Sequence, residues 1–300
     1  MSEQFLYPRP KKASILIISL WSVAVLSLLS IALAHFVFQQ IKFTNFFMRS
    51  TISLPLAKAA LQRVFFDRSN DYTLDYDSPR ELSREQQVVL CENTSYKYYF
   101  VDRFTVDEEE RVIDESALIN INLASSARLK NLPGLDEVLA QAIATSGRKP
   151  FKLKEELLLI EGIDKETFDQ FKDLITVHGA GKININTVSS AVLSVLGLDE
   201  KIIEKIIRYR NEYEGEDGKE DTEDDGAFTD SATIVSYLDS FIGLALSEQQ
   251  ALFDLAADTL SVKSEYLRFN VIPQVKGKDG VRYSILIHPK TKKIISWREG

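Results

Sequence analysis

The densest group of side chains able to do chemistry lies in the segment Glu214–Asp225, which reads EGEDGKEDTEDD. Eight carboxylates and one lysine in twelve residues repel one another unless a cation binds between them. Calcium takes about six to eight oxygen ligands in flexible geometry, and glycines allow the tight turns that such a loop needs. The spacing differs from that of an EF-hand. We therefore predict either a solvated acidic loop or a Ca²⁺ site with ligands from Asp217, Glu220, Asp221, Asp224 and Asp225.

Residues for nucleophilic or metal-dependent catalysis are sparse in the rest of the chain. The single cysteine, Cys91, excludes an internal disulfide. The three histidines, His35, His178 and His288, are scattered and have no Ser, Cys or Asp neighbour in a catalytic pattern. We expect them to be packing or surface residues, and we expect no enzymatic activity and no organic cofactor.

Three turns in the middle of the chain share the pattern glycine, hydrophobic residue, aspartate. In a helix-hairpin-helix that grips DNA, a second glycine stands where these turns carry aspartate, so that a phosphate can reach bare amides at a helix N-terminus. An aspartate there caps the helix itself and repels an anion. We therefore interpret the turns as structural. They are Gly134-Leu135-Asp136, Gly162-Ile163-Asp164 and Gly197-Leu198-Asp199.

The charge balance also argues against a nucleic-acid partner. The chain has a formal net charge of −8 and a pI near 5.1, whereas nucleic-acid binders need a basic stripe to displace counterions. Basic residues do cluster in two places, and we interpret both clusters as solvated faces. They are Lys149, Lys152 and Lys154 in one loop, and Lys201, Lys205, Arg208 and Arg210 on one amphipathic helix.

These turns belong to an internal repeat. ININLASSARLKNLPGLDE begins at Ile119, and ININTVSSAVLSVLGLDE begins at Ile183. Each copy predicts a short extended stretch, a helix that opens at Ser-Ser-Ala, and a turn into a second helix. We interpret the paired asparagines of each copy, Asn120 with Asn122 and Asn184 with Asn186, as strand-end and cap residues.

A membrane-spanning helix is predicted near the N-terminus. Ala13–Phe38 carries no formal charge apart from His35, and its length exceeds the roughly 20 residues that cross a bilayer. Arg9, Lys11 and Lys12 precede it, which places the N-terminus in the cytoplasm and the remainder outside. An alternative is a secretory signal cut after Ala32-Leu33-Ala34.

The N-terminal region also resembles bacterial type IV prepilins and type II secretion pseudopilins. The basic leader MSEQFLYPRPKKA would be cut after Ala13 by prepilin peptidase, and the mature chain would begin at Ser14. The leader of that family usually ends in glycine, and major pilins carry a glutamate where this chain has Ile18. The minor pseudopilin K typically lacks that glutamate and has a Leu-Trp in its apolar segment, as at Leu20-Trp21.

The rest of the chain predicts an α+β fold with a large helical insertion. Apolar residues at helical spacing continue to Asp67, with a kink or a fresh turn expected at Pro55, and residues 72–93 look polar and turn-rich. Strands are predicted around a hairpin in residues 96–114 and over residues 265–298, and they would pair in one sheet. The expected parts are a leader (1–13), a transmembrane and spine helix (14–67), pilin-like strands (68–118 and 263–300) and a helical insertion (119–262).

The resemblance to pseudopilin K implies a role in assembly. A subunit of this kind would sit in the bacterial inner membrane with a periplasmic domain, at the tip of the pseudopilus with other minor pseudopilins. The family also has calcium sites in its helical domain, and Asp217-Gly218-Lys219-Glu220-Asp221 matches the form of its loops. The alternative is an envelope-anchored DNA-binding protein of the competence type, which Ile119–Val177 resembles in outline.

Overall fold

A computed structural model of the chain describes residues 12–70, 75–78, 82, 86–91, 94–99, 101–102, 111–112, 114–215, 218, 225–275 and 277–300. The chain divides into two units, Met1–Ile52 and Ser53–Gly300. One long helix, α1 (Lys12–Ser69), begins in the first unit and ends in the second. The helix continues without a break through Pro55.

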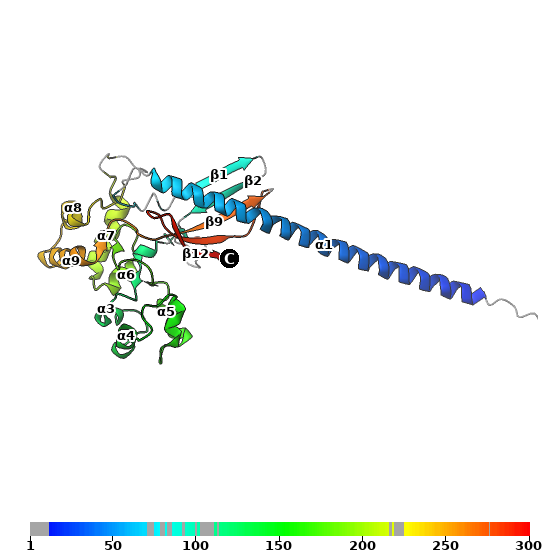
Figure 1. Cartoon of the computed structure of the whole chain (residues 1–300), viewed down its shortest axis with the longest axis horizontal. Coiled ribbons are helices and arrows are strands. Elements are labelled where there is room, and N and C mark those ends of the chain that lie inside the picture. The colour runs from blue at the N-terminus through cyan, green and yellow to red at the C-terminus, as the bar shows by residue number, and fades with distance from the viewer. Residues whose placement is uncertain are drawn as a thin grey trace, which may run out of the picture. The chain divides into compact units, whose positions relative to one another are not determined.

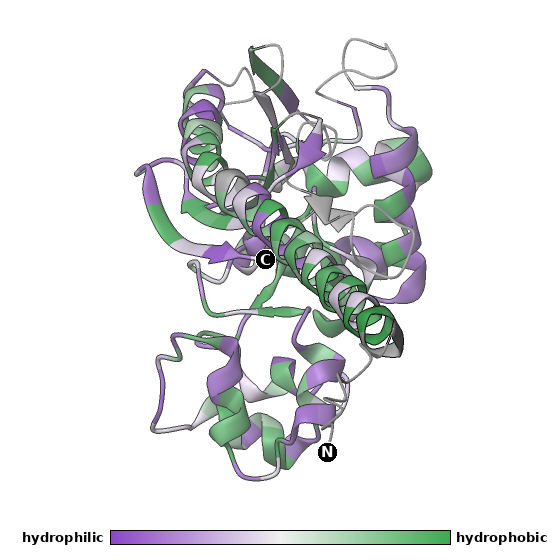
Figure 2. Ribbon diagram, turned by 90° about the vertical axis from the view of Figure 1, so that its right-hand side faces the viewer, coloured by the Kyte–Doolittle hydropathy of each residue, from purple (hydrophilic) through white to green (hydrophobic). Residues whose placement is uncertain are grey.

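In the first unit, α1 is largely apolar, and its ribbon is mostly green toward the N-terminal end (Figure 2). Its large hydrophobic side chains between Ile15 and Phe47 are exposed. The serine hydroxyls donate to carbonyls within the helix, for example Ser22 Oγ to Ile18 O at 2.9 Å and Ser27 Oγ to Val23 O at 2.8 Å. Such bonds satisfy the hydroxyls without water. By length and composition, this helix is able to cross a membrane.

The second unit contains an antiparallel sheet that joins distant parts of the chain (Figure 1). Thr94 pairs with Val275, so a strand from before the helical middle lies beside one from after it. The prediction of an α+β fold with a small antiparallel sheet is therefore confirmed. The strand order is β1 (Gln86–Cys91), β2 (Thr94–Tyr99), β9 (Leu267–Val275), β11 (Tyr283–His288) and β12 (Lys293–Glu299), with β10 (Lys278–Asp279) paired to β9.

The last turns of α1 belong to the core of this unit. Leu56, Ala57, Ala60, Leu61 and Val64 are buried at helical spacing, so one stripe of the helix faces inward. Polar contacts tie the same turns to the sheet and its connections. The Tyr98 hydroxyl donates to Asp67, and Ser53 Oγ accepts from the Val281 amide at 3.2 Å.

The segment 72–93 departs from its prediction as polar and turn-rich, because it contains β1. This strand is an edge strand with five of its six residues exposed, so it lacks the alternation that marks a half-buried strand. Of the hairpin predicted in residues 96–114, two residues on each side pair with each other. Val101–Asp102 (β3) pairs antiparallel with Arg111–Val112 (β4). The main partners of β2 are β1 and β9.

The helical middle consists of two successive copies, each closed by a short parallel strand pair. In the first copy Ile119 pairs with Ile175, and in the second Ile183 pairs with Leu260. The first contains η1 (Glu115–Ala117), β5 (Ile119–Asn120), α3 (Ser126–Leu129), α4 (Glu137–Ala144), η2 (Lys154–Leu159), α5 (Lys165–Phe171) and β6 (Ile175–Thr176). The second contains β7 (Ile183–Asn184), α6 (Ser190–Val195), α7 (Glu200–Glu212), η3 (Ser231–Thr233), α8 (Ile234–Ile242), α9 (Leu246–Asp258) and β8 (Leu260–Ser261).

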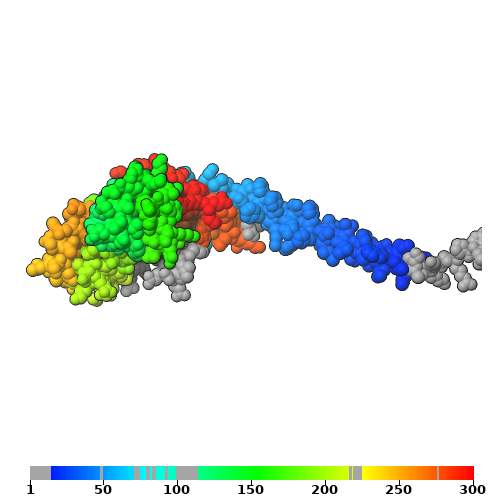
Figure 3. Space-filling view, turned by 90° about the horizontal axis from the view of Figure 1, so that it is seen from below, coloured from blue at the N-terminus to red at the C-terminus, as the bar shows by residue number. Residues whose placement is uncertain are grey.

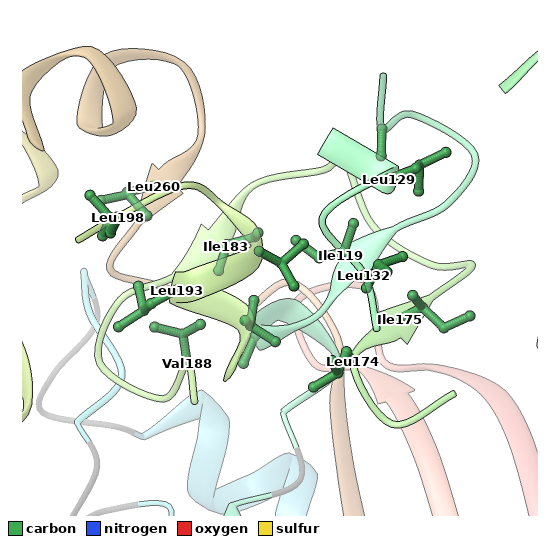
Figure 4. Packing of buried hydrophobic residues seen from close by; sticks show 14 of the residues in the cluster. Ile119, Leu129, Leu132, Leu174, Ile175, Ile183, Val188, Leu193, Leu198 and Leu260 are labelled. Carbon is green, nitrogen blue, oxygen red and sulfur yellow. The ribbon is translucent and has the colours of Figure 1, made fainter. Parts of the chain in front are cut away.

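A single hydrophobic core runs through both copies (Figure 4). Ile119 and Leu129 from the first copy belong to the same buried cluster as Ile183 and Leu193 from the second. Each of these side chains is at most 1% exposed. The two copies therefore form one packed body, in which each turn and cap has a fixed position.

Candidate functional site

The three glycine turns have the backbone geometry that their sequence requires. Gly134, Gly162 and Gly197 have φ angles of 76°, 91° and 88°, in the left-handed region that favours glycine. The hydrophobic residue that follows each glycine is buried, with exposures of 7% for Leu135, 4% for Ile163 and 6% for Leu198. These side chains fill the core between consecutive helices.

The three aspartates cap the helices that follow the turns. The carboxylate of Asp136 accepts from the Leu139 amide at 2.8 Å, and that of Asp164 accepts from the Thr167 amide at 2.8 Å. Asp199 accepts from the amide of the second helical residue, Lys201, at 3.0 Å. The bonds from Thr167 lower the pKa of Asp164. Each turn thus presents a carboxylate at the helix N-terminus, where a DNA-gripping hairpin would hold a phosphate.

The first two turns pack against each other's helices. A Cβ at Gly134 would lie 2.7 Å from Gln170 Oε1 on α5, and a Cβ at Gly162 would lie 2.8 Å from Leu139 Cδ2 on α4. At Gly197 a Cβ would meet nothing within 4 Å. The first copy therefore forms a reciprocal pair of hairpins, while the third turn stands apart from it.

The second asparagine of each repeat, Asn122 or Asn186, makes two hydrogen bonds to the backbone of a residue distant in sequence. Asn122 Oδ1 accepts from the Phe151 amide at 2.7 Å, and its Nδ2 donates to the Phe151 carbonyl at 3.0 Å. Asn186 makes the same two bonds with Phe228, at 2.8 and 2.9 Å. Each asparagine therefore anchors the loop that leads into the second half of its copy, before η2 in the first copy and before η3 in the second.

Two buried carboxylates stand where the sheet meets the helical middle, and the sequence analysis missed both. Asp114 accepts from the hydroxyls of Ser264 and Thr187 and, at 2.8 Å, from the Ser116 amide. Burial raises its pKa to about 7, against the lowering effect of those hydrogen bonds. In the sequence Asp114 looks like part of a hairpin strand, and a hydrophilic residue at a strand end gives no sign of burial.

Glu115, next in the chain, has the opposite electrostatic balance. Burial raises its pKa, but the Arg268 guanidinium, the Lys154 ammonium and a hydrogen bond from Thr176 Oγ1 at 2.5 Å together hold it below its usual value. Arg268 bonds to Glu115 through both Nε and Nη2. Glu115 thus links β9 to the end of the first copy.

The acidic segment is only partly described by the structure. Asp217, Glu220, Asp221 and Asp224 lie outside the described residues. Asp225 is described and is buried, at 2% exposure. Beside it the Gly226 amide donates to the Tyr213 carbonyl at 2.8 Å, so the two ends of the segment are held together. Within the described residues, no three His, Cys, Asp or Glu side chains gather as metal ligands would.

The other residues singled out in the sequence are distributed as follows. Ala13 and Ser14 lie in the first turn of α1. On α7, Lys205 pairs with Glu248 at 2.6 Å and Arg208 pairs with Glu212 at 2.7 Å. The interpretation of this helix as a solvated basic face is wrong for Arg210. Its guanidinium donates to the Val188 carbonyl at 2.6 Å, and burial lowers its pKa to about 10.

Comparisons with known proteins cover different parts of the chain. The helix-hairpin-helix motif family matches residues 114–176, which is the first copy of the repeat. Over 149 residues the chain is 28% identical to the endonuclease/exonuclease/phosphatase family domain-containing protein 1 of Xenopus laevis. That alignment covers 41% of this chain and 26% of the Xenopus protein, so the chain spans about a quarter of that relative's length.

A solved structure matches nearly the whole fold. It is a chain in the crystal structure of the GspK-GspI-GspJ complex from the type 2 secretion system of enterotoxigenic Escherichia coli. The match covers 87% of this chain and 99% of that chain, with a TM-score of 0.52 and 15% identity. The predicted pseudopilin-like fold is therefore confirmed.

Proposed function

We propose that this chain is a minor pseudopilin of a type II secretion system and occupies the position of the K subunit at the tip of the pseudopilus. The observation that carries the proposal is the combination of three parts in one chain. These parts are an apolar N-terminal helix, a small sheet joining strands from both sides of an insertion, and a helical insertion, and they match a chain of a pseudopilin complex over 87% of the length. Its work would be assembly rather than catalysis.

In this proposal the two halves of α1 have different tasks. The segment Ala13–Phe38, which carries no formal charge apart from His35, would lie in the inner membrane before assembly and then pack among the spines of neighbouring minor pseudopilins. The second half is already committed to its own sheet through its buried stripe. The helical insertion, the bulkiest part of the chain, would stop further subunits from being added above it.

The absence of a glutamate at Ile18 supports a terminal position. In the family, that glutamate is thought to pair with the N-terminus of the subunit ahead, and a tip subunit has no subunit ahead of it. Ile18 lies in the exposed apolar stretch of α1. A tip subunit would gain nothing from a carboxylate there, and an ionised one in the bilayer would cost free energy.

Mass spectrometry of the mature N-terminus, on protein made in its own envelope, tests this proposal. A chain that begins at Ser14, with an N-methyl group, is expected from processing by prepilin peptidase. A chain that begins at His35 would be an ordinary exported protein, and an intact Met1 would be a fixed membrane anchor. Either of these two results would overturn the proposal.

We also propose that the segment Glu214–Asp225 binds Ca²⁺. Carboxylate oxygens are the ligands that this ion prefers. The hydrogen bond from the Gly226 amide to the Tyr213 carbonyl and the burial of Asp225 support an ordered attachment of the segment to the fold. Bound calcium would neutralise the mutual repulsion of the carboxylates and fix the segment on the insertion.

A second candidate function is duplex DNA binding at the envelope, favoured by the helix-hairpin-helix match over residues 114–176. Three features oppose DNA binding: the net negative charge of the chain, the Asp136 carboxylate and the Asp164 carboxylate. If it holds, the chain should bind duplex DNA with strong salt dependence, and charge reversal at Lys201 or Arg208 should weaken the binding.

A further inference from the structure

A recess of about 650 Å³ opens between the helical middle and the C-terminal strands of the second unit. Figure 3 shows the surface where the green residues of the first copy meet the red strands. Its volume lies within the range of about 300–1,000 Å³ that is typical of ligand sites. Part of its wall is apolar, formed by Leu118, Leu153, Phe168 and Val177.

The recess is rich in cations although the protein is acidic. The chain has 44 acidic and 36 basic residues, yet seven cations and four carboxylates line this recess. They come from both walls. Lys152, Lys154, Lys172 and Arg210 belong to the helical middle, and Arg268, Arg282 and Arg298 belong to the C-terminal strands and the connection before β11.

Two of the four carboxylates are already satisfied inside the protein. Glu115 is bound by Arg268, and Asp114 accepts from Ser264 and Thr187. The remaining two, Glu155 and Asp173, are exposed at the rim. Among the cations, Lys172 pairs with Asp169 at 2.7 Å and Arg268 with Glu115. Lys152, Lys154 and Arg298 make no ion pair with a residue that the structure describes, so these three are the cations that an entering anion could bind.

Two half-buried cations, Lys154 and Arg210, make hydrogen bonds to carbonyls, and neither has an ion pair with a described residue. Lys154 Nζ donates to the Lys172 carbonyl at 3.1 Å, and Arg210 donates to the Val188 carbonyl at 2.6 Å. Burial lowers the pKa of both side chains, and at Lys154 the nearby carboxylates of Glu115, Asp173 and Glu155 offset part of this effect. An anion entering the recess would offset more of it.

Lys154, Arg268 and Arg298 line the recess together with His178. All three act on the half-buried His178, whose pKa is lowered first by burial and then by these neighbouring charges, although Glu115 acts in the opposite direction. An anionic group bound beside His178 would lie among these cations, and further cations line both walls of the recess.

We propose that this recess binds an acidic peptide segment of a partner protein, in extended conformation, with carboxylates facing the cations and apolar side chains against Leu153 and Phe168. Cations spread over two walls match several carboxylates along a strand better than one compact anion. A duplex nucleic acid is too wide for a recess of this volume. Binding here does not require the chain to be a pseudopilin.

Fluorescence anisotropy on the full chain in a nonionic detergent tests the proposal. The probe is a fluorescein-labelled peptide of alternating glutamate and leucine, and its partner control carries glutamine for glutamate. The recess variant is Lys152→Glu with Arg298→Glu, because both side chains are exposed and their reversal should spare the fold. The matched control is Lys201→Glu with Lys293→Glu, which changes the net charge equally at exposed positions outside the recess.

The acidic peptide is expected to bind in a salt-dependent manner and the glutamine peptide to bind weakly. The recess variant should raise the dissociation constant by about tenfold or more, and the control variant should leave it within about twofold. Thermal melting of each variant verifies that it is folded. Equal weakening by both variants, or no binding of the acidic peptide, would overturn the proposal. So would recess-dependent binding of duplex DNA or inorganic phosphate without binding of the peptide.

Discussion

Asn122 and Phe151 are joined by two hydrogen bonds, from the side-chain amide of one to the backbone of the other. The Asn122 oxygen accepts from the Phe151 amide at 2.7 Å, and its nitrogen donates to the Phe151 carbonyl at 3.0 Å. Both residues lie in the first copy, on either side of α3 and α4. A side-chain amide satisfies the donor and the acceptor of one residue, as a neighbouring strand would.

The same pair of bonds occurs between Asn186 and Phe228 in the second copy. There the connection after α7 includes the acidic segment, yet Phe228 at its far end is bound by the same two hydrogen bonds. The Asn-to-Phe contact is therefore the part of the repeat that survives a large insertion. It joins the start of each copy to the connection between its two halves, independently of what lies between.

We predict that Asn186→Ala destabilises the chain by about 1–3 kcal/mol, because it leaves the buried amide and carbonyl of Phe228 without partners. The shift in urea midpoint of the folded domain measures this. Asn131→Ala serves as the control, since Asn131 is exposed and makes one bond, to the Val195 carbonyl. An equal decrease of the urea midpoint in both variants would show that the two bonds to Phe228 stabilise the fold no more than the single bond of Asn131.

The sequence was sufficient for the parts of the fold that depend on local pattern. The two ININ copies predicted two similar units, and Leu267, Phe269 and Val271 alternate as a half-buried strand does. That strands from both sides of a helical middle share one sheet was also predicted, and the pairing of β2 with β9 realises it. Turn chemistry at Gly134 and Gly162 also followed directly, because a positive φ before a capped helix favours glycine.

Burial of charged groups could not be predicted in the same way. Arg210 follows the spacing of Lys201 and Arg208 on α7, but it faces the Val188 carbonyl. Asp114 lies beside Ser264, which is distant in sequence, and only the closed fold brings them together. The edge strand β1 escaped prediction because its residues are exposed on both faces, so no alternation marks them.

Capping by the turn aspartates predicts a loss of stability on truncation. Asp164→Ala removes the acceptor of the Thr167 amide at the start of α5 and should lower the urea midpoint, whereas Asp164→Asn keeps an acceptor and should lower it less. Because the pKa of Asp164 is lowered in the fold, its contribution is present above the unfolded pKa and is lost as the pH falls through the folded pKa. Urea unfolding at neutral and acidic pH measures both effects, and equal costs for Ala and Asn would contradict the cap.

Asp114 predicts the opposite dependence on pH. Its pKa is raised to about 7, so the folded state keeps a proton that the unfolded state releases, and the stability from this group falls as the pH rises from about 4 to about 7. Asp77, which pairs with Arg68, lies near enough to raise this pKa further.

We predict that Asp114→Asn reduces the fall in stability between about pH 5 and pH 8, by up to a few kcal/mol, because asparagine stays neutral. Its oxygen can still accept from the Ser116 amide, and the Ser264 and Thr187 hydroxyls can rotate to accept from its nitrogen. The difference in unfolding free energy at the two pH values measures the effect. An unchanged pH slope would mean that Asp114 titrates outside this window.

Calcium binding by the acidic segment predicts a rise in the melting temperature of the chain with millimolar Ca²⁺, since a ligand that binds only the folded state stabilises it. Asp225→Asn removes a carboxylate at the buried end of the segment and should abolish most of that rise. Asp258→Asn removes an equal charge from an exposed position at the end of α9 and should leave the rise intact. If Ca²⁺ leaves the melting temperature of the unaltered chain unchanged, or if Mg²⁺ raises it equally, the segment is a solvated acidic loop and its carboxylates hold no specific ion.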